Sequence, residues 1–303
     1  MNRLLADFIT RVDRENLAIE GIAVMEKGRV TAEHRWTPDL PRNIYSHTKS
    51  FMATAVGIAV SEGALSLDDR LVDCFPEAVP AGADPKLSGI RLRHLLTMSS
   101  GFDRSLLMGA QRRAGVGAPD YVGYMLSQPV LRVPGELFHY STADSILAGR
   151  MLEQKIGMGL AEFLWERIFR PLEIGFPIWE CCPRGHAIGG GGMHLALKDM
   201  MKLGWLYLNE GRWAGEQLLD PAWVREATRL QIDTPPDDNV WHCGYGYQFW
   251  ISPYPDAYRA DGAYGQITTV LPKCGMVVSI QCPETGDFPK VQAALHEEFL
   301  SRL

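Results

Sequence analysis

The spacing of apolar residues along the chain predicts four elements before residue 64. Residues 2–16 repeat apolar side chains at helical spacing, which predicts an amphipathic helix. Two apolar runs follow, near residues 18–25 and up to about residue 36, with the turn residues Glu26-Lys27-Gly28 between them. This pattern indicates a β-hairpin. Residues 46–62 predict a helix that begins with a polar segment, becomes alanine-rich and apolar from Phe51, and ends near Gly63.

The middle of the chain, from about residue 65 to 235, reads as helices joined by loops. The pattern predicts a short helix stopped at Gly101, two helices separated at Gly157 and ended by Pro171, and two more near residues 194–211 and 221–230. The proline-rich stretch at residues 233–238 closes this part. Residues 245–254, 257–272 and 276–282 read as successive antiparallel strands, and residues 288–303 read as a terminal helix.

Strands near both ends with helices between them predict an α+β fold in which one antiparallel sheet is assembled from both termini. We expect a sheet subdomain from residues 1–64 and 236–303, and an inserted helical subdomain from residues 65–235. Together they make one composite domain. The helix that starts at residue 46 lies at the junction, where a catalytic cleft is expected.

Charge and composition narrow the function classes. The 303 residues carry a net charge of -6 without a basic stripe, which argues against nucleic acid as a partner. We see neither a signal peptide nor a transmembrane run, so the expected location is cytoplasmic and no membrane partner is predicted. The six cysteines lack a C-x-x-C pair and are expected to be reduced and mostly buried. His186 and His194 are too far apart for one helix face, so no zinc site is predicted.

The polar segment Ser46-His47-Thr48-Lys49-Ser50 comes directly before the apolar helix. Positions i and i+3 share a helix face, so Ser46 and Lys49 point the same way. A buried lysine is costly unless it is paired or loses its proton, and a neutral amine accepts a serine proton. The helix N-terminus also favours an oxyanion. The alternative is a capping serine followed by an exposed lysine.

Several landmarks in order resemble the penicillin-binding protein and class C β-lactamase-like serine hydrolases. "YSHTKSF" resembles the S-x-x-K nucleophile motif, and "PGELFHYSTADSILAGRMLE" resembles the block with the second motif, Tyr-x-Asn. "LSLDDRLVDCFPE", "IRLRHLLTMSSGF" and the glycine-rich "IGGGGMHLALKDMM" also match, and "DGAYGQITTVLP" falls where the third motif lies. The resemblance covers residues 20–285 and implies a β-lactamase-like fold.

By this resemblance, Ser46 is the nucleophile, Lys49 its base or proton relay, and Tyr140 the second member of the proton shuttle. A phenol beside an ammonium is expected to have a depressed pKa, so that the two groups titrate as one unit. Without the surrounding sequence block, the favoured interpretation of Tyr140 would be an aromatic residue that caps a loop.

Two positions depart from the family pattern. Thr142 stands where the second motif has asparagine, so no amide is present to contact a substrate carbonyl. The lysine of the third motif, Lys-Thr-Gly, falls on Ala260 in the triplet Ala260-Asp261-Gly262. Without that cation, turnover of β-lactams or D-alanyl peptides is not expected unless the neighbouring Arg259 replaces it.

The segment "GAYGQ" resembles the branch that contains 6-aminohexanoate-dimer hydrolase and short-chain esterases. This likeness implies that the backbone N–H groups of Ala263 and Ser46 form the oxyanion hole. Gly262 would allow the strand to approach the substrate closely. A tight hairpin turn is the alternative explanation for these glycines.

The sequence therefore predicts a serine hydrolase that cleaves a small ester, amide or short peptide through an acyl-enzyme, without metal or organic cofactor. One alternative is a β-lactamase or D-amino-acid peptidase of the same family. Another is a non-catalytic relative that keeps the cleft to bind a peptide or amide. We also expect the loop at residues 109–121 to shape the pocket.

Overall fold

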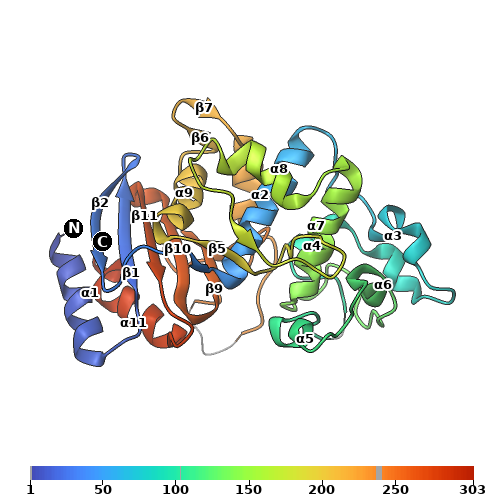
Figure 1. Cartoon of the computed structure of the whole chain (residues 1–303), viewed down its shortest axis with the longest axis horizontal. Coiled ribbons are helices and arrows are strands. Elements are labelled where there is room, and N and C mark those ends of the chain that lie inside the picture. The colour runs from blue at the N-terminus through green and yellow to red at the C-terminus, as the bar shows by residue number, and fades with distance from the viewer. Residues whose placement is uncertain (1, 103, 237–240) are drawn as a thin grey trace.

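A six-stranded antiparallel sheet forms one end of the molecule (Figure 1). The computed structural model describes residues 2–102, 104–236 and 241–303. The sheet has the order β2-β1-β11-β10-β9-β8, so strands from both ends of the chain lie side by side. Their bounds are β1 (Gly21–Glu26), β2 (Arg29–Arg35), β8 (Trp250–Ile251), β9 (Tyr258–Gly262), β10 (Gln266–Leu271) and β11 (Met276–Gln281). This confirms the predicted α+β architecture.

The hairpin of β1 and β2 follows the predicted turn. Lys27 and Gly28 both have positive φ angles, 52° and 75°, as a two-residue hairpin turn requires. Successive side chains of β1 point to opposite faces of the sheet and so enter two different cores. Ile22 and Val24 face one side of the sheet, whereas Ala23 and Met25 join the larger core on the other side.

Helices cover both faces of the sheet. α1 (Asn2–Glu15) and α11 (Phe288–Glu298) pack on each other and on the face that carries Ile22 and Val24. Phe8 and Leu295 are buried in this layer. α9 (Leu197–Leu208) covers the opposite face, against β1, β10 and β11. Because both faces are covered, every residue of β10 and β11 is buried, including polar residues such as Thr268 and Gln281.

α2 (Thr48–Ser61) lies between the sheet and the helical part (Figure 1). Every residue from Thr48 to Ala59 is buried, because the helix packs on β9 on one side and on α7 (Thr142–Ile156) and α8 (Leu160–Leu164) on the other. A helix that is enclosed on all sides needs no polar face. The lysine in its first turn is therefore buried.

The helical part contains the predicted helices with altered bounds. α7 ends where expected, since Gly157 has the left-handed φ of 68° that follows many helix ends. α8 continues as a π-helical turn, Trp165–Phe169, just before Pro171. The remaining helices are α3 (Leu71–Cys74), α4 (Leu92–Leu96), α5 (Gly109–Arg113), α6 (Tyr121–Leu126) and α10 (Pro221–Thr228). α4 ends five residues before Gly101, so the helix end predicted from the sequence was too late.

Short strands are the main difference from the prediction. The strand expected at residues 245–254 is reduced to β8, and residues 237–240, in the expected sheet subdomain, lie outside the described residues. A three-stranded sheet of β3 (Arg42–Asn43), β5 (Met193–Leu195) and β4 (Ile178–Trp179) was not predicted. Neither was the hairpin of β6 (Arg212–Trp213) and β7 (Glu216–Gln217). Pairings of two or three residues are too short to show a strand period.

Candidate active site

The structure brings Ser46 and Lys49 together at the start of α2. Ser46 lies in a 3₁₀ turn, Tyr45–His47, that leads directly into the helix, and its side chain is partly exposed. Lys49 is 1% exposed, and its Nζ donates to Ser46 Oγ at 3.2 Å. The same Nζ donates to the carbonyl oxygen of Gly190 at 2.5 Å. The expected helix face is therefore present, and the alternative of an exposed lysine is wrong.

Burial controls the charge of Lys49. Desolvation lowers the pKa of its amine to about 7, and the nearby Arg112 guanidinium lowers it further by repulsion. Both contacts of Nζ are to uncharged oxygen atoms, so neither partner supplies a negative charge to hold the proton. Near neutral pH a large share of the amine is consequently neutral. A neutral amine in contact with a serine hydroxyl is a proton acceptor.

Tyr140 forms the third side of this cluster. Lys49 Nζ lies 5.1 Å from the centroid of its ring, and the phenol hydrogen-bonds the Ser46 side chain. The ring stacks on Trp250 with centroids 5.8 Å apart and planes at 18°. This stacking and the contact with Lys49 fix the phenol beside the serine.

The expected depression of the tyrosine pKa is wrong. Burial raises the pKa of Tyr140 above its ordinary value, the Ser46 hydrogen bond opposes this, and the Asp261 carboxylate adds to it. The phenol therefore stays protonated at neutral pH, while Lys49 loses its proton more easily than an exposed lysine. The two groups are suited to different roles, a phenol that donates and an amine that accepts.

Arg259 and Asp261 stand on β9 where the motif lysine is missing. Arg259 is 1% exposed, and its Nε donates to Asp261 Oδ2 at 2.6 Å. Its other two nitrogens donate to the carbonyl oxygens of Ile251 and Trp241. The whole guanidinium is thus engaged within the protein. This differs from the sequence-based option that Arg259 supplies the missing cation.

Gly262 ends β9 next to the nucleophile turn, and Ala263 follows it. A Cβ on Gly262 would lie 2.1 Å from the carbonyl oxygen of Ile44, so only glycine permits this approach of the strand to the segment before Ser46. Ala263 begins a 3₁₀ turn, Ala263–Gly265, and is exposed. The role of its N–H group in an oxyanion hole stays a prediction.

Thr142 is the first residue of α7 and is 4% exposed. Its hydroxyl donates to the sulfur of Met108 at 3.2 Å. The methyl side faces the glycine-rich segment, because a Cβ on Gly190 would lie 2.7 Å from Thr142 Cγ2. Thr142 thus packs beside the loop that holds Lys49, and a substrate-binding role for it stays a prediction.

Two tyrosines near the site were missed by sequence reasoning. Tyr45 directly precedes Ser46, Tyr264 directly follows Ala263, and both have left-handed φ angles, 48° and 66°. Their rings meet edge to face at 5.1 Å, and the Tyr45 hydroxyl donates to Glu284. Left-handed backbone in bulky residues concentrates at functional sites. No local sequence pattern predicts this left-handed backbone, since tyrosine normally avoids the conformation.

Other predictions concern metals, cysteines and membranes. Among residues 2–102, 104–236 and 241–303, no cluster of three or more His, Cys, Asp or Glu side chains is arranged to hold a metal ion. Of the six cysteines only Cys74 and Cys282 are buried, so the expectation that most are buried is wrong. None of the helices in the described part of the chain is both long and apolar enough to cross a bilayer.

Comparison with protein families gives a match over nearly the whole chain. The family model described as Beta-lactamase matches residues 9–299. Esterase EstB of Burkholderia gladioli is 30% identical over 165 residues, which cover 50% of this chain and 41% of the esterase. A D-aminopeptidase of Brucella anthropi is 29% identical over 168 residues, covering 50% of this chain and 30% of that protein. The chain thus matches less than half the length of these curated relatives.

Among solved structures, a penicillin-binding protein homologue from Caulobacter crescentus superposes with a TM-score of 0.79. The superposition covers 100% of this chain and 97% of the homologue at 16% sequence identity. At that identity the likeness concerns the fold alone.

Proposed function

The chain belongs to the Beta-lactamase family, and on that premise we propose that it is a serine hydrolase acting on a small ester, amide or short peptide. One observation carries the proposal. A buried Lys49 amine, whose pKa is lowered to about 7, lies 3.2 Å from a partly exposed Ser46 hydroxyl. The Tyr140 phenol beside both groups completes a proton relay.

In the acylation step, Ser46 Oγ attacks the substrate carbonyl carbon while its proton moves to the neutral Lys49 amine. The negative charge that develops on the carbonyl oxygen is stabilised by the N–H groups of Ser46 and Ala263. Tyr140 gives its proton to the departing alkoxide or amine as the carbon–heteroatom bond breaks, and regains a proton from Lys49. Water then attacks the acyl-serine by the reverse proton path, which releases the acid and restores the hydroxyl.

The proposed substrates follow from the missing cation on β9. Because the Arg259 guanidinium is buried and each of its nitrogens already donates to Asp261 or to a carbonyl oxygen, it is not presented to a substrate carboxylate. This favours neutral esters and amides over β-lactams and D-alanyl peptides, which carry a carboxylate. The names of the curated relatives, an esterase and a D-aminopeptidase, are consistent with carbonyl substrates of this size.

The direct test is hydrolysis of p-nitrophenyl acetate and butyrate. We expect Ser46→Ala to lower kcat at least about a thousandfold, because the attacking group is lost. Ser61→Ala is the matched control: Ser61 also lies on α2, and its hydroxyl donates to the Gly57 carbonyl oxygen one turn earlier, away from the site. A fluorophosphonate should add its mass to Ser46 alone. An unchanged rate in Ser46→Ala would overturn the proposal.

A non-catalytic binding protein is the second candidate, favoured by the replacements at Thr142 and Ala260. Thr142 points its hydroxyl at Met108, so it does not act as the amide of the family motif. Intact protein that neither hydrolyses any ester or amide nor gains mass from the fluorophosphonate would support this candidate. Nitrocefin turnover would instead identify a β-lactamase.

Two further expectations form part of the proposal. We place the site in a cleft between a sheet subdomain, residues 1–64 with 236–303, and a helical subdomain, residues 65–235. We also propose a cytoplasmic location, which the free thiols of Cys74, Cys181, Cys182, Cys274 and Cys282 support because a reducing compartment keeps thiols unpaired. Cell fractionation with an antibody to the chain tests the location.

A further inference from the structure

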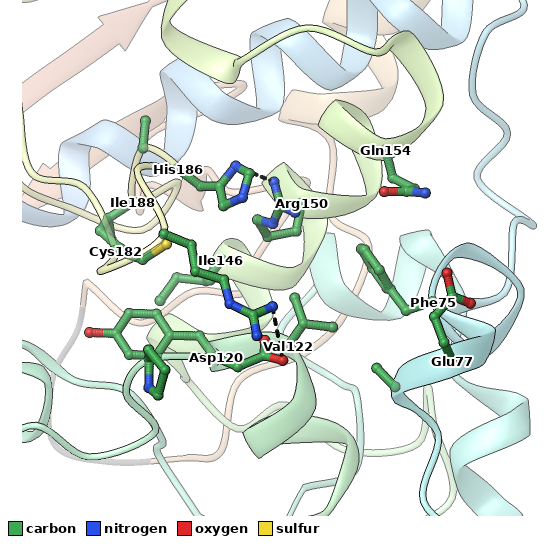
Figure 2. A pocket seen from close by; sticks show the side chains of 15 residues that line it. Phe75, Glu77, Asp120, Val122, Ile146, Arg150, Gln154, Cys182, His186 and Ile188 are labelled. Carbon is green, nitrogen blue, oxygen red and sulfur yellow. Dashed lines mark hydrogen bonds and ion pairs between the residues drawn. The ribbon is translucent and has the colours of Figure 1, made fainter.

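A cavity of about 300 Å³ lies within the helical part, and Ser46, Lys49 and Tyr140 are not among its lining residues. Figure 2 shows side chains that reach it from four segments. They come from the region after α3, the start of α6, one face of α7, and the loop at residues 182–188. Its size is at the lower end of the range for small-molecule sites.

The floor of the cavity is apolar. Phe75, Val122, Ile146 and Ile188 line it and are each no more than 8% exposed. These side chains come from separate segments, so the apolar surface is continuous only in the folded chain. An apolar floor of this kind binds a small branched or aromatic group and removes it from water.

Charged groups of both signs surround this apolar floor. Arg150 uses Nη1 in its bonds to Glu153 and His186, which leaves Nε and Nη2 as free donors with respect to the described residues. Arg184 pairs with Asp120 at 3.1 Å through Nη1 and is otherwise exposed. Glu77 supplies a carboxylate for which, within the part of the chain that the structure describes, no hydrogen bond or ion pair is found. The cavity therefore offers donors and an acceptor at the same time.

We propose that this cavity binds a zwitterionic amino acid with an apolar side chain. Its carboxylate would accept hydrogen bonds from Arg150 and Arg184, and its ammonium group would lie against Glu77. The apolar side chain would cover Phe75 and Ile146. A ligand with only one charge pairs with one side of the cavity and makes no charged contact with the other side.

The test uses the full chain with Ser46→Ala, so that no turnover interferes, in isothermal titration. Leucine is compared with 4-methylvalerate, which lacks the amine, and with isopentylamine, which lacks the carboxylate. We expect leucine to bind at least tenfold more tightly than either analogue. Glu77→Gln and Arg184→Gln should each lower the affinity for leucine at least fivefold. Both residues are exposed, so neither change should disturb folding.

Matched controls are Glu216→Gln and Arg212→Gln in the β6–β7 hairpin, which lies far from α6 in Figure 1. These should leave the affinity unchanged. A second readout is alkylation of Cys182, which lines the cavity, in a Cys181→Ser background: leucine should protect Cys182 and leave the exposed Cys274 reactive. The proposal is overturned if leucine does not bind, if a single-charge analogue binds equally well, or if the cavity variants and the controls behave alike.

Discussion

Lys49 is the residue on which the proposed chemistry depends. Its pKa of about 7 predicts the pH dependence of turnover, because the protonated amine cannot accept the serine proton. We expect kcat/KM for p-nitrophenyl butyrate to rise about tenfold per pH unit below pH 7 and to level off above it. Steady-state rates from pH 5 to 9, with the rate of the Ser46→Ala protein subtracted, measure this pH dependence.

Arg112 provides a check on that assignment. Its guanidinium is the second cause of the lowered lysine pKa, so Arg112→Gln should raise the pKa and move the midpoint of the profile to higher pH. Lys49→Arg should remove the rising limb together with the activity, since a guanidinium keeps its proton. A profile whose midpoint is the same in the Arg112→Gln protein would argue that another group controls the rate.

The same residue should lower the stability of the fold. A folded pKa of about 7 against an ordinary 10.5 means that the unfolded chain binds more protons between these values. Stability therefore rises with pH across this window, and below pH 7 the full cost of the lowered pKa applies, on the order of 5 kcal/mol. Leaving the buried Gly190 carbonyl oxygen without this donor costs about 1–3 kcal/mol, which is less, so the desolvation of the amine decides the sign.

Lys49→Met is therefore expected to be more stable than the natural chain by about 2–3 kcal/mol at pH 7, because methionine fills the space without a charge. The gain should shrink as the pH approaches 10. Urea unfolding at pH 7 and at pH 9.5 checks both the sign and the trend. A variant that is less stable at pH 7 would mean that the lysine stabilises the fold.

At the scale of elements, the site depends on how closely β9 approaches the turn before α2. Gly262→Ala places a Cβ 2.1 Å from the Ile44 carbonyl oxygen, a backbone atom that cannot rotate away. We expect a loss of about 1–3 kcal/mol in unfolding free energy. We also expect at least a hundredfold loss of kcat/KM in the protein that remains folded, because small displacements of catalytic groups reduce rates strongly.

Gly175→Ala is the matched control for this change. No described atom lies within 4 Å of a Cβ at position 175, so both stability and activity should be unaffected. Circular dichroism in urea and rates corrected for the folded fraction separate the two effects. Full activity in Gly262→Ala would show that the catalytic geometry tolerates a displaced strand.

At the scale of the whole molecule, one loop connects the two sites. Ile188 lines the cavity in the helical part, and Gly190, two residues later, accepts the hydrogen bond from Lys49. The indole Nε1 of Trp179 donates to the carbonyl oxygens of Ile188 and Gly191, which ties this loop together. A ligand that contacts Ile188 therefore acts on the carbonyl group that holds the proposed base.

This connection predicts that leucine changes esterase activity from a distance. We expect at least a twofold change in kcat and a shifted midpoint of the pH profile, both abolished by Glu77→Gln. Initial rates at saturating ester with and without leucine measure the effect. Leucine that only raises KM, and does so equally in Glu77→Gln, would instead be competing at Ser46.

How much of the site could be predicted depends on the range of the forces involved. The shared helix face of Ser46 and Lys49 and the order of elements were predicted correctly because helical spacing and apolar periods are local properties. The tyrosine pKa was misjudged, since it depends on burial and on Asp261, which is distant in sequence. The exposed cysteines and the short pairings of β3, β5 and β4 also lacked any local signal.

The sequence by itself determined that a hydroxyl and an amine share the start of a buried helix, with a sheet built from both ends of the chain. Only the tertiary structure decided that the amine is largely uncharged near neutral pH, that Tyr140 lies beside it, and that Arg259 is bound by Asp261. It also formed the cavity beside α7. The physical reason is that desolvation, ion pairing and cavity shape arise from residues far apart in the chain, whereas periodicity arises from neighbours.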